Sequence, residues 1–197
     1  ISPLGIFGAN HDLKDVARWA SQDAVITHPH RVCLEANSLF TMAIAHAIRH
    51  GTNGAGLYRM IVGWAENMKV DGSLMDAVRA AAGAPPADYI HKQGWVLTAF
   101  RNALWQLLHA PNLEEAVVDT VMRGGDTDTN AAICGALLGS VYGLNALPGQ
   151  WRDALLNCRP AAGSLHVRHP RPECFWPVDA LEIARELLHA RMPRKPS

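Results

Sequence analysis

The sequence predicts an all-α fold, with a single domain over residues 1–190 and a flexible tail over residues 191–197. Apolar residues recur at spacings of three and four along nearly the whole chain, which is the pattern of amphipathic helices. No run of alternating β-branched residues is long enough to indicate a sheet. Hydrophobic residues make up 49% of the chain and charged residues 18%, against about 25% charged in an average soluble domain. This balance favours a well-buried fold over disorder.

The expected helices follow one another along the chain, and several have a recognisable start or stop. Asn10 and Asp12 are cap candidates for the first of them. A longer apolar stripe over residues 32–47 ends at Gly51, a typical helix C-cap. Further helical patterns cover residues 56–67, 74–82, 95–109, 113–122, the segment after Gly125, and residues 151–157 and 178–191. The chain is therefore expected to contain eight or nine helices.

Charge and cysteine usage exclude several classes of protein. The chain has 18 basic and 18 acidic residues, so it lacks the basic excess that is typical of nucleic-acid-binding proteins. The longest apolar stretch, residues 131–148, is interrupted by small residues and Asn145, which favours a buried helix over a membrane span. The four cysteines never form a CxxC pair, so neither a disulfide framework nor a zinc knuckle is indicated. A cytoplasmic protein that binds neither membrane nor nucleic acid is expected.

The segment GGDTDTN, residues 124–130, is the most informative part of the sequence. Its two glycines allow a sharp bend, and Asp126 and Asp128 follow directly before a helix. Several oxygen ligands within five residues suit a hard divalent cation such as Mg²⁺, which usually retains some of its waters. The alternative is that Asp128 or Thr129 only caps the helix while Asp126 is solvated.

Small residues follow at a spacing of four, at Ala131, Gly135, Gly139 and Gly143. Each glycine inside a helix costs about 0.5–1 kcal/mol relative to alanine. Such a stripe is expected where another backbone approaches closely. We therefore expect a central helix whose carboxylate-bearing N-terminus faces a cleft.

With these features, the sequence resembles the ADP-ribosylglycohydrolases, a family that includes the ADP-ribosyl-acceptor hydrolases and the dinitrogenase-reductase-activating glycohydrolase. The resemblance covers essentially the whole chain. It rests on GGDTDTNAAICGALLGSVYGLNALPGQW at 124–151, GWV at 94–96, ALW at 103–105, LEEAV at 113–117, ITHP at 26–29 and PLGI at 3–6.

The resemblance implies an all-α fold with two Mg²⁺ ions, or Mn²⁺, in a central cleft that binds ADP-ribose. It assigns metal binding to Asp126, Asp128 and Thr129, and substrate binding to His28, Trp95, Gly125 and Thr127. The implied reaction is hydrolysis of the glycosidic bond between ADP-ribose and a modified protein side chain, with arginine as the favoured acceptor. Serine, a nucleobase or a free metabolite remains an open alternative. For Trp95, the alternative to a ligand-facing position is packing against Trp105 inside the helix bundle.

The family pattern also has an N-terminal half, with a Thr-Asp-Asp metal motif and an acidic catalytic residue, and this chain lacks it. The chain is therefore expected to be the C-terminal portion of a longer enzyme, or one of two chains, and to be inactive alone. The general acid or base is not identified in this sequence. The alternative function is that of a non-catalytic relative or fragment that serves as a binding or structural protein, although intact metal ligands argue against it.

Overall fold

The computed structural model describes residues 1–165 and 167–190. In this part of the chain the structure has ten α-helices, three short 3₁₀ helices and no strand, which confirms the all-α prediction. The predicted tail at 191–197 lies outside the described residues. The helices are α1 (Ser2–Gly8), α2 (Leu13–Ala24), α3 (Arg31–His50), α4 (Gly54–Met68), α5 (Gly72–Ala80), α6 (Val96–His109), α7 (Leu113–Met122), α8 (Thr127–Tyr142), α9 (Gly149–Leu156) and α10 (Ala180–His189), with η1 (Leu144–Ala146), η2 (Glu173–Phe175) and η3 (Pro177–Asp179).

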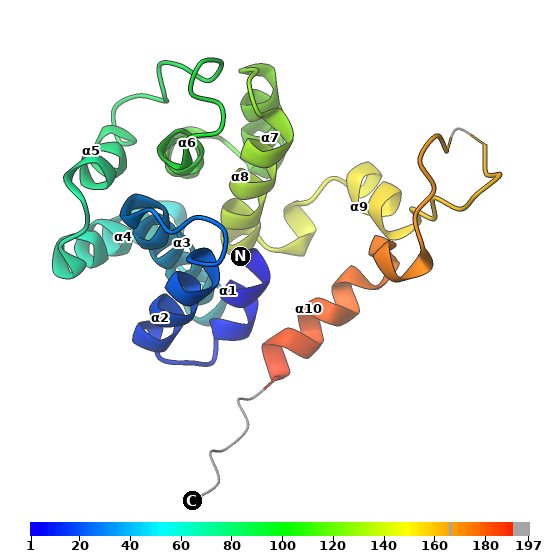
Figure 1. The fold of residues 1–197 in the computed structure, drawn as a ribbon, viewed down its shortest axis with the longest axis horizontal. Helices are drawn as coiled ribbons and strands as arrows, with labels where there is room; N and C mark the ends of the chain where they lie inside the picture. Colours follow the sequence, from blue (N-terminus) through cyan, green and yellow to red (C-terminus); the bar gives the residue numbers. More distant parts are fainter. Residues whose placement is uncertain (166, 191–197) are drawn as a thin grey trace, which may run out of the picture.

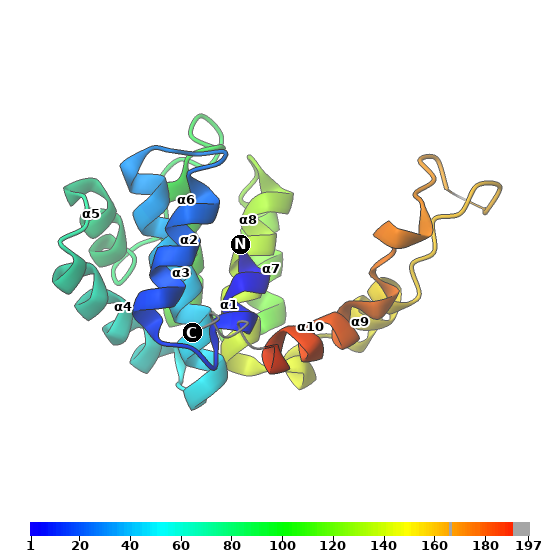
Figure 2. The same ribbon diagram turned by 60° about the horizontal axis from the view of Figure 1, so that its bottom comes forward.

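The helices α1 to α8 gather in one bundle, while α9 and α10 lie to one side of it and α10 packs against α1 (Figures 1 and 2). Helix α3 lies at the centre of the bundle and packs against α1, α2, α4, α6 and α8. Its apolar side chains meet those of the surrounding helices, including the fully buried Leu57, Leu104 and Leu137. Each such side chain contributes about 1.5–3 kcal/mol to stability through burial. This rigid core holds the start of α8 in place.

The local signals read from the sequence appear as helix ends in the structure. The Asp12 side chain accepts a hydrogen bond of 2.8 Å from the Lys14 backbone N–H and caps α2. Asn112, which is not predicted as a cap from the sequence, caps α7 in the same way through the Glu115 N–H, also at 2.8 Å. Gly51 closes α3 in the left-handed conformation, with φ +61°. The main omission is α1, which the sequence pattern does not predict.

Helix α8 is central, since it packs against α3, α6 and α7, but its small residues do not act as predicted. A Cβ added at Gly135 would make only an ordinary contact with Val117, and at Gly139 it would meet nothing within 4 Å. Gly143 is the C-cap with φ +76°, a conformation that favours glycine. The expected close approach of another backbone is therefore wrong for the described residues, and nothing in the structure explains Gly139.

Within residues 1–165 and 167–190, no helix combines the length and the apolar character needed to cross a bilayer.

Candidate functional site

The GGDTDTN segment forms a sharp turn followed by the first residues of α8. Gly124 and Gly125 have φ angles of +78° and +72°, which strongly favour glycine over residues with a side chain. Asp126 is the N-cap of α8, and Thr127 is the first residue of that helix. The turn therefore delivers two carboxylates to the positive end of the helix dipole, where their ionised forms are stabilised.

The two carboxylates share one backbone donor. The Thr129 N–H donates to Asp128 Oδ1 at 2.9 Å and more weakly to Asp126 Oδ1 at 3.4 Å. Hydrogen bonding with the Thr129 side chain, followed by that with Asp128, holds the pKa of Asp126 below the ordinary aspartate value. Asp126 is half-buried, whereas Asp128 and Thr129 are exposed. The turn thus presents an anionic, oxygen-rich group that solvent and small ions can reach.

A cavity of about 350 Å³ opens beside this turn. It is lined from three directions: by the loop between α2 and α3 with the start of α3, by the loop before α6 with the start of α6, and by the start of α8. Its lining residues are His28, Cys33, Asn37, Gln93, Gly94, Trp95, Val96, Ala99, Asp126, Thr129, Asn130 and Ile133. A neighbouring hollow of about 440 Å³ shares His28, Asn37, Thr129 and Ile133, so the open region continues toward Ile1.

The structure brings four of the predicted site residues around this one cavity: His28, Trp95, Asp126 and Thr129. Asp128, Gly125 and Thr127 are not among the lining residues, although they belong to the same turn. The His28 ring Nδ1 lies 2.9 Å from the Thr27 hydroxyl oxygen.

Trp95 does not pack in the bundle core. Its side chain is 38% exposed, it precedes α6 as the N-cap residue, and its ring lies 6.0 Å from that of His30. Trp105 instead stacks on His109, with ring centroids 5.2 Å apart. The alternative in which the two tryptophans pack together is therefore wrong.

Three polar lining residues were not predicted: Asn37, Gln93 and Asn130. Asn130 stands out because it is 1% exposed while neither its Nδ2 nor its Oδ1 has a hydrogen-bond partner. A buried polar group without a partner costs about 1–3 kcal/mol. The sequence held a signal for it, since Asn130 shares the buried face of α8 with Cys134 and Leu137.

These residues fit a site for a hard divalent cation, but only in part. In the described part of the chain, no group of three or more His, Cys, Asp and Glu side chains could hold a metal ion. The turn supplies two carboxylates and the Thr129 hydroxyl, and Mg²⁺ commonly binds one or two carboxylates and keeps several waters. The unpartnered amide of Asn130 lies against the same cavity, which suits a second contact to a bound ion's waters or to a ligand.

Comparison with known proteins identifies the family. The family model of the ADP-ribosylglycohydrolases matches residues 1–195. The chain belongs to the ADP-ribosylglycohydrolase family. The chain has the fold of a solved structure described as an ADP-ribosylglycohydrolase-related protein complex, with a TM-score of 0.69 and 24% identity over 94% of this chain and 55% of that one.

Curated relatives of the chain carry related names. Chicken (Gallus gallus) ADP-ribosylhydrolase ARH3 is 22% identical over 79% of this chain and 52% of its own length. ADP-ribosylarginine hydrolase Tri1 of Pseudomonas putida is 28% identical over 53% of this chain and 26% of its own. A mimivirus protein provisionally named an ADP-ribosyl glycohydrolase is 28% identical over 74% of this chain and 47% of its own. The chain thus spans about half the length of the chicken and mimivirus relatives, each of which matches most of this chain.

Proposed function

We propose that this protein hydrolyses the glycosidic bond that links ADP-ribose to a modified protein side chain, and that it depends on Mg²⁺, with Mn²⁺ as a possible substitute. The observation that carries the proposal is that Asp126 and Thr129 line the same cavity as Trp95 and His28. Membership of the family supports the reaction class. The names of the Tri1 relatives, both ADP-ribosylarginine hydrolases, favour arginine as the acceptor.

In this proposal one side of the cavity binds the metal ions and the other sides bind the nucleotide. Asp126, Asp128 and Thr129 hold two Mg²⁺ ions together with ligands from outside this chain. Bound Mg²⁺ would supply charge stabilisation and would orient the ribose hydroxyls and a water. The exposed indole of Trp95 offers a flat apolar face to the nucleotide. The His28 ring, whose Nδ1 faces the Thr27 hydroxyl, offers its Nε2 for a hydrogen bond to the nucleotide.

The site in this chain is partial, because only two carboxylates gather at the turn. We infer that the remaining metal ligands and the general acid or base come from sequence beyond this chain, either in the same polypeptide or in a second one. The four cysteines are free, which favours a reducing, cytoplasmic location.

The proposal is tested by giving the natural protein an arginine-ADP-ribosylated protein and measuring the release of free ADP-ribose. We expect release in the presence of Mg²⁺, complete loss after chelation, and recovery when Mg²⁺ or Mn²⁺ is added back. Serine-ADP-ribosylated protein, tested in parallel, decides the acceptor. Release that continues unchanged in excess chelator would contradict the role of the metal. ADP-ribose binding without turnover of any acceptor would support the alternative, a non-catalytic binding protein.

Replacement of Trp95 by alanine is expected to weaken ADP-ribose binding by about 1–3 kcal/mol, the contribution of one base stacked on an aromatic ring. The matched control is Trp151→Ala, because Trp151 belongs to α9 and does not line the cavity. Calorimetric titration of ADP-ribose in Mg²⁺ measures both. Equal affinities for Trp95→Ala and the parent protein would show that the indole does not contact the nucleotide.

A further inference from the structure

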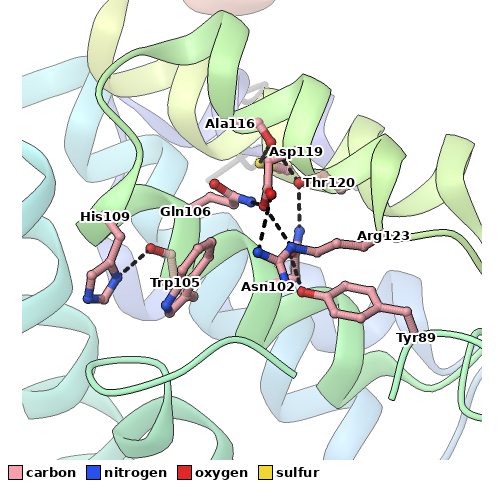
Figure 3. A network of polar contacts seen from close by, with 10 residues as sticks. Tyr89, Asn102, Trp105, Gln106, His109, Ala116, Asp119, Thr120 and Arg123 are labelled. Atoms are coloured by element: carbon pink, nitrogen blue, oxygen red, sulfur yellow. Dashed lines mark hydrogen bonds and ion pairs between the residues drawn. The ribbon is translucent and has the colours of Figure 1, made fainter. Parts of the chain in front are cut away.

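A network of polar side chains (Figure 3) adjoins the Gly124–Gly125 turn, since one of its members, Arg123, directly precedes Gly124. Most of its members are buried in an otherwise apolar core, where an unpaired polar group is costly. Each has partners within the network, which joins the loop before α6 to α6 and α7. Its members are Tyr89, Asn102, Gln106, Asp119, Thr120 and Arg123, and we call them the Tyr89–Arg123 network.

One branch of the network begins at Tyr89, which is 6% exposed. Its hydroxyl donates to Asn102 Oδ1 at 2.7 Å, and Asn102 Nδ2 donates to the Thr120 hydroxyl at 3.0 Å. The Thr120 hydroxyl in turn donates to the Ala116 carbonyl at 2.8 Å. Burial raises the pKa of Tyr89 to about 12, so the phenol remains a neutral donor at physiological pH. The loop before α6, which contains Trp95, is thereby fixed to helices α6 and α7 by this branch.

The second branch is centred on Arg123. Its Nε donates to Asp119 Oδ2 at 2.6 Å and its Nη2 to Asp119 Oδ1 at 3.2 Å, a bidentate pair. Gln106 Nε2 donates to the same carboxylate. The Arg123 guanidinium carbon lies 4.7 Å from the centroid of the Trp105 ring and 5.4 Å from that of the Tyr89 ring, within the range of cation–π attraction. Arg123 is thereby held from several sides.

Both branches meet at the turn. Arg123 is the residue before Gly124, so its side chain anchors the chain where it enters the turn. The Tyr89 backbone lies against the far side: a Cβ on Gly125 would overlap the Tyr89 carbonyl oxygen and lie 2.8 Å from the carbonyl carbon. Asp126 is the next residue. The turn is therefore fixed on two sides by residues that do not line the cavity.

We propose that Tyr89 and Arg123 are positioning residues that hold the backbone of residues 124–130 in the conformation that presents Asp126 and Thr129 to the cavity. The consequence for metal binding rests on the proposed function, whereas the effect on the backbone does not. A network that only stabilises the bundle would contribute to the stability of all its helices alike. A positioning network acts first on the turn.

The test is hydrogen–deuterium exchange of the natural protein without added metal. Tyr89→Phe removes one hydroxyl and leaves the ring over which Arg123 lies. We expect the amides of residues 124–130 to exchange about two- to tenfold faster, since a typical hydrogen bond contributes an equivalent amount to local stability. The matched control is Tyr58→Phe, because the Tyr58 hydroxyl donates to the Val78 carbonyl at 2.9 Å and neither residue lines the cavity. It should leave these amides unchanged.

A second variant, Arg123→Lys, keeps the charge but loses the bidentate geometry, and it should accelerate exchange in the same amides. Two results for Tyr89→Phe would overturn the proposal: faster exchange throughout the bundle, or no acceleration of exchange at residues 124–130. Titration of Mn²⁺ adds an independent readout, with an affinity expected to fall several-fold in Tyr89→Phe and not in Tyr58→Phe. If the parent protein binds neither Mn²⁺ nor Mg²⁺, the metal dependence of the proposed function fails while the exchange data still decide the role of the network.

Discussion

Replacing Asp126 and Asp128 together by asparagine is expected to abolish metal-dependent release of ADP-ribose while the protein stays folded. Neither side chain belongs to the core, and asparagine caps helices as well as aspartate does, so α8 should still begin at Thr127. The change removes two negative charges from a turn that offers no other carboxylate. Loss of a group that merely supports a metal ligand costs about 10–100-fold, so loss of the ligands themselves should cost more than about a hundredfold.

The matched control is the double variant Asp12→Asn and Asp71→Asn. These two aspartates cap α2 and α5 and do not line the cavity, so they undergo the same chemical change and match Asp126 in position as N-cap residues. Both double variants should have the circular dichroism spectrum of the parent, but only the Asp126/Asp128 variant should lose turnover and Mg²⁺ affinity. Full activity in that variant would refute the metal assignment and return Asp126 to the role of a simple helix cap.

The fold was predictable to the extent that its helices carry local signals. Caps such as Asp12 and the left-handed Gly51 act within a few residues, so they can be read from the sequence. Helix α1 has no such clear local signal, because Gly5 and Gly8 lower its helix propensity. The same glycines explain why it forms: a Cβ would lie 2.6 Å from Ile44 Cγ2 at Gly5 and 2.7 Å from Val16 Cγ2 at Gly8. Close packing on α2 and α3 therefore outweighs weak propensity.

The residues of the candidate site also differ in how far the sequence alone could predict them. Asp126 and Thr129 are close in sequence, so their proximity follows from the turn itself. His28 and Trp95 came from the family resemblance and not from any local pattern. The Tyr89–Arg123 network left no recognisable signal, because Tyr89 meets Asn102 across 13 residues and Asn102 meets Thr120 across 18. Such contacts depend on how α6 and α7 pack, which periodicity does not specify.

Replacement of Gly125 by alanine is expected to have the second largest effect, on both stability and metal binding. The φ of +72° alone costs an alanine about 1–2 kcal/mol. The added methyl group would also overlap the Tyr89 carbonyl, which is backbone and cannot rotate away as a side chain could. The turn or the Tyr89 loop must therefore shift, and Asp126 shifts with it. We expect a lower Tm and a loss of Mg²⁺ affinity of about tenfold or more, because a ligand must keep its geometry to bind.

Gly124→Ala separates the two causes. Gly124 has nearly the same φ, +78°, but a Cβ there would meet nothing within 4 Å. This variant should therefore lose about as much stability as the backbone strain requires while it retains its affinity for Mg²⁺. The difference between the two alanine variants measures the contact with Tyr89, since everything else about the substitution is shared. Equal Mg²⁺ affinities in the two variants would mean that the Tyr89 loop yields to the methyl group and does not hold the turn.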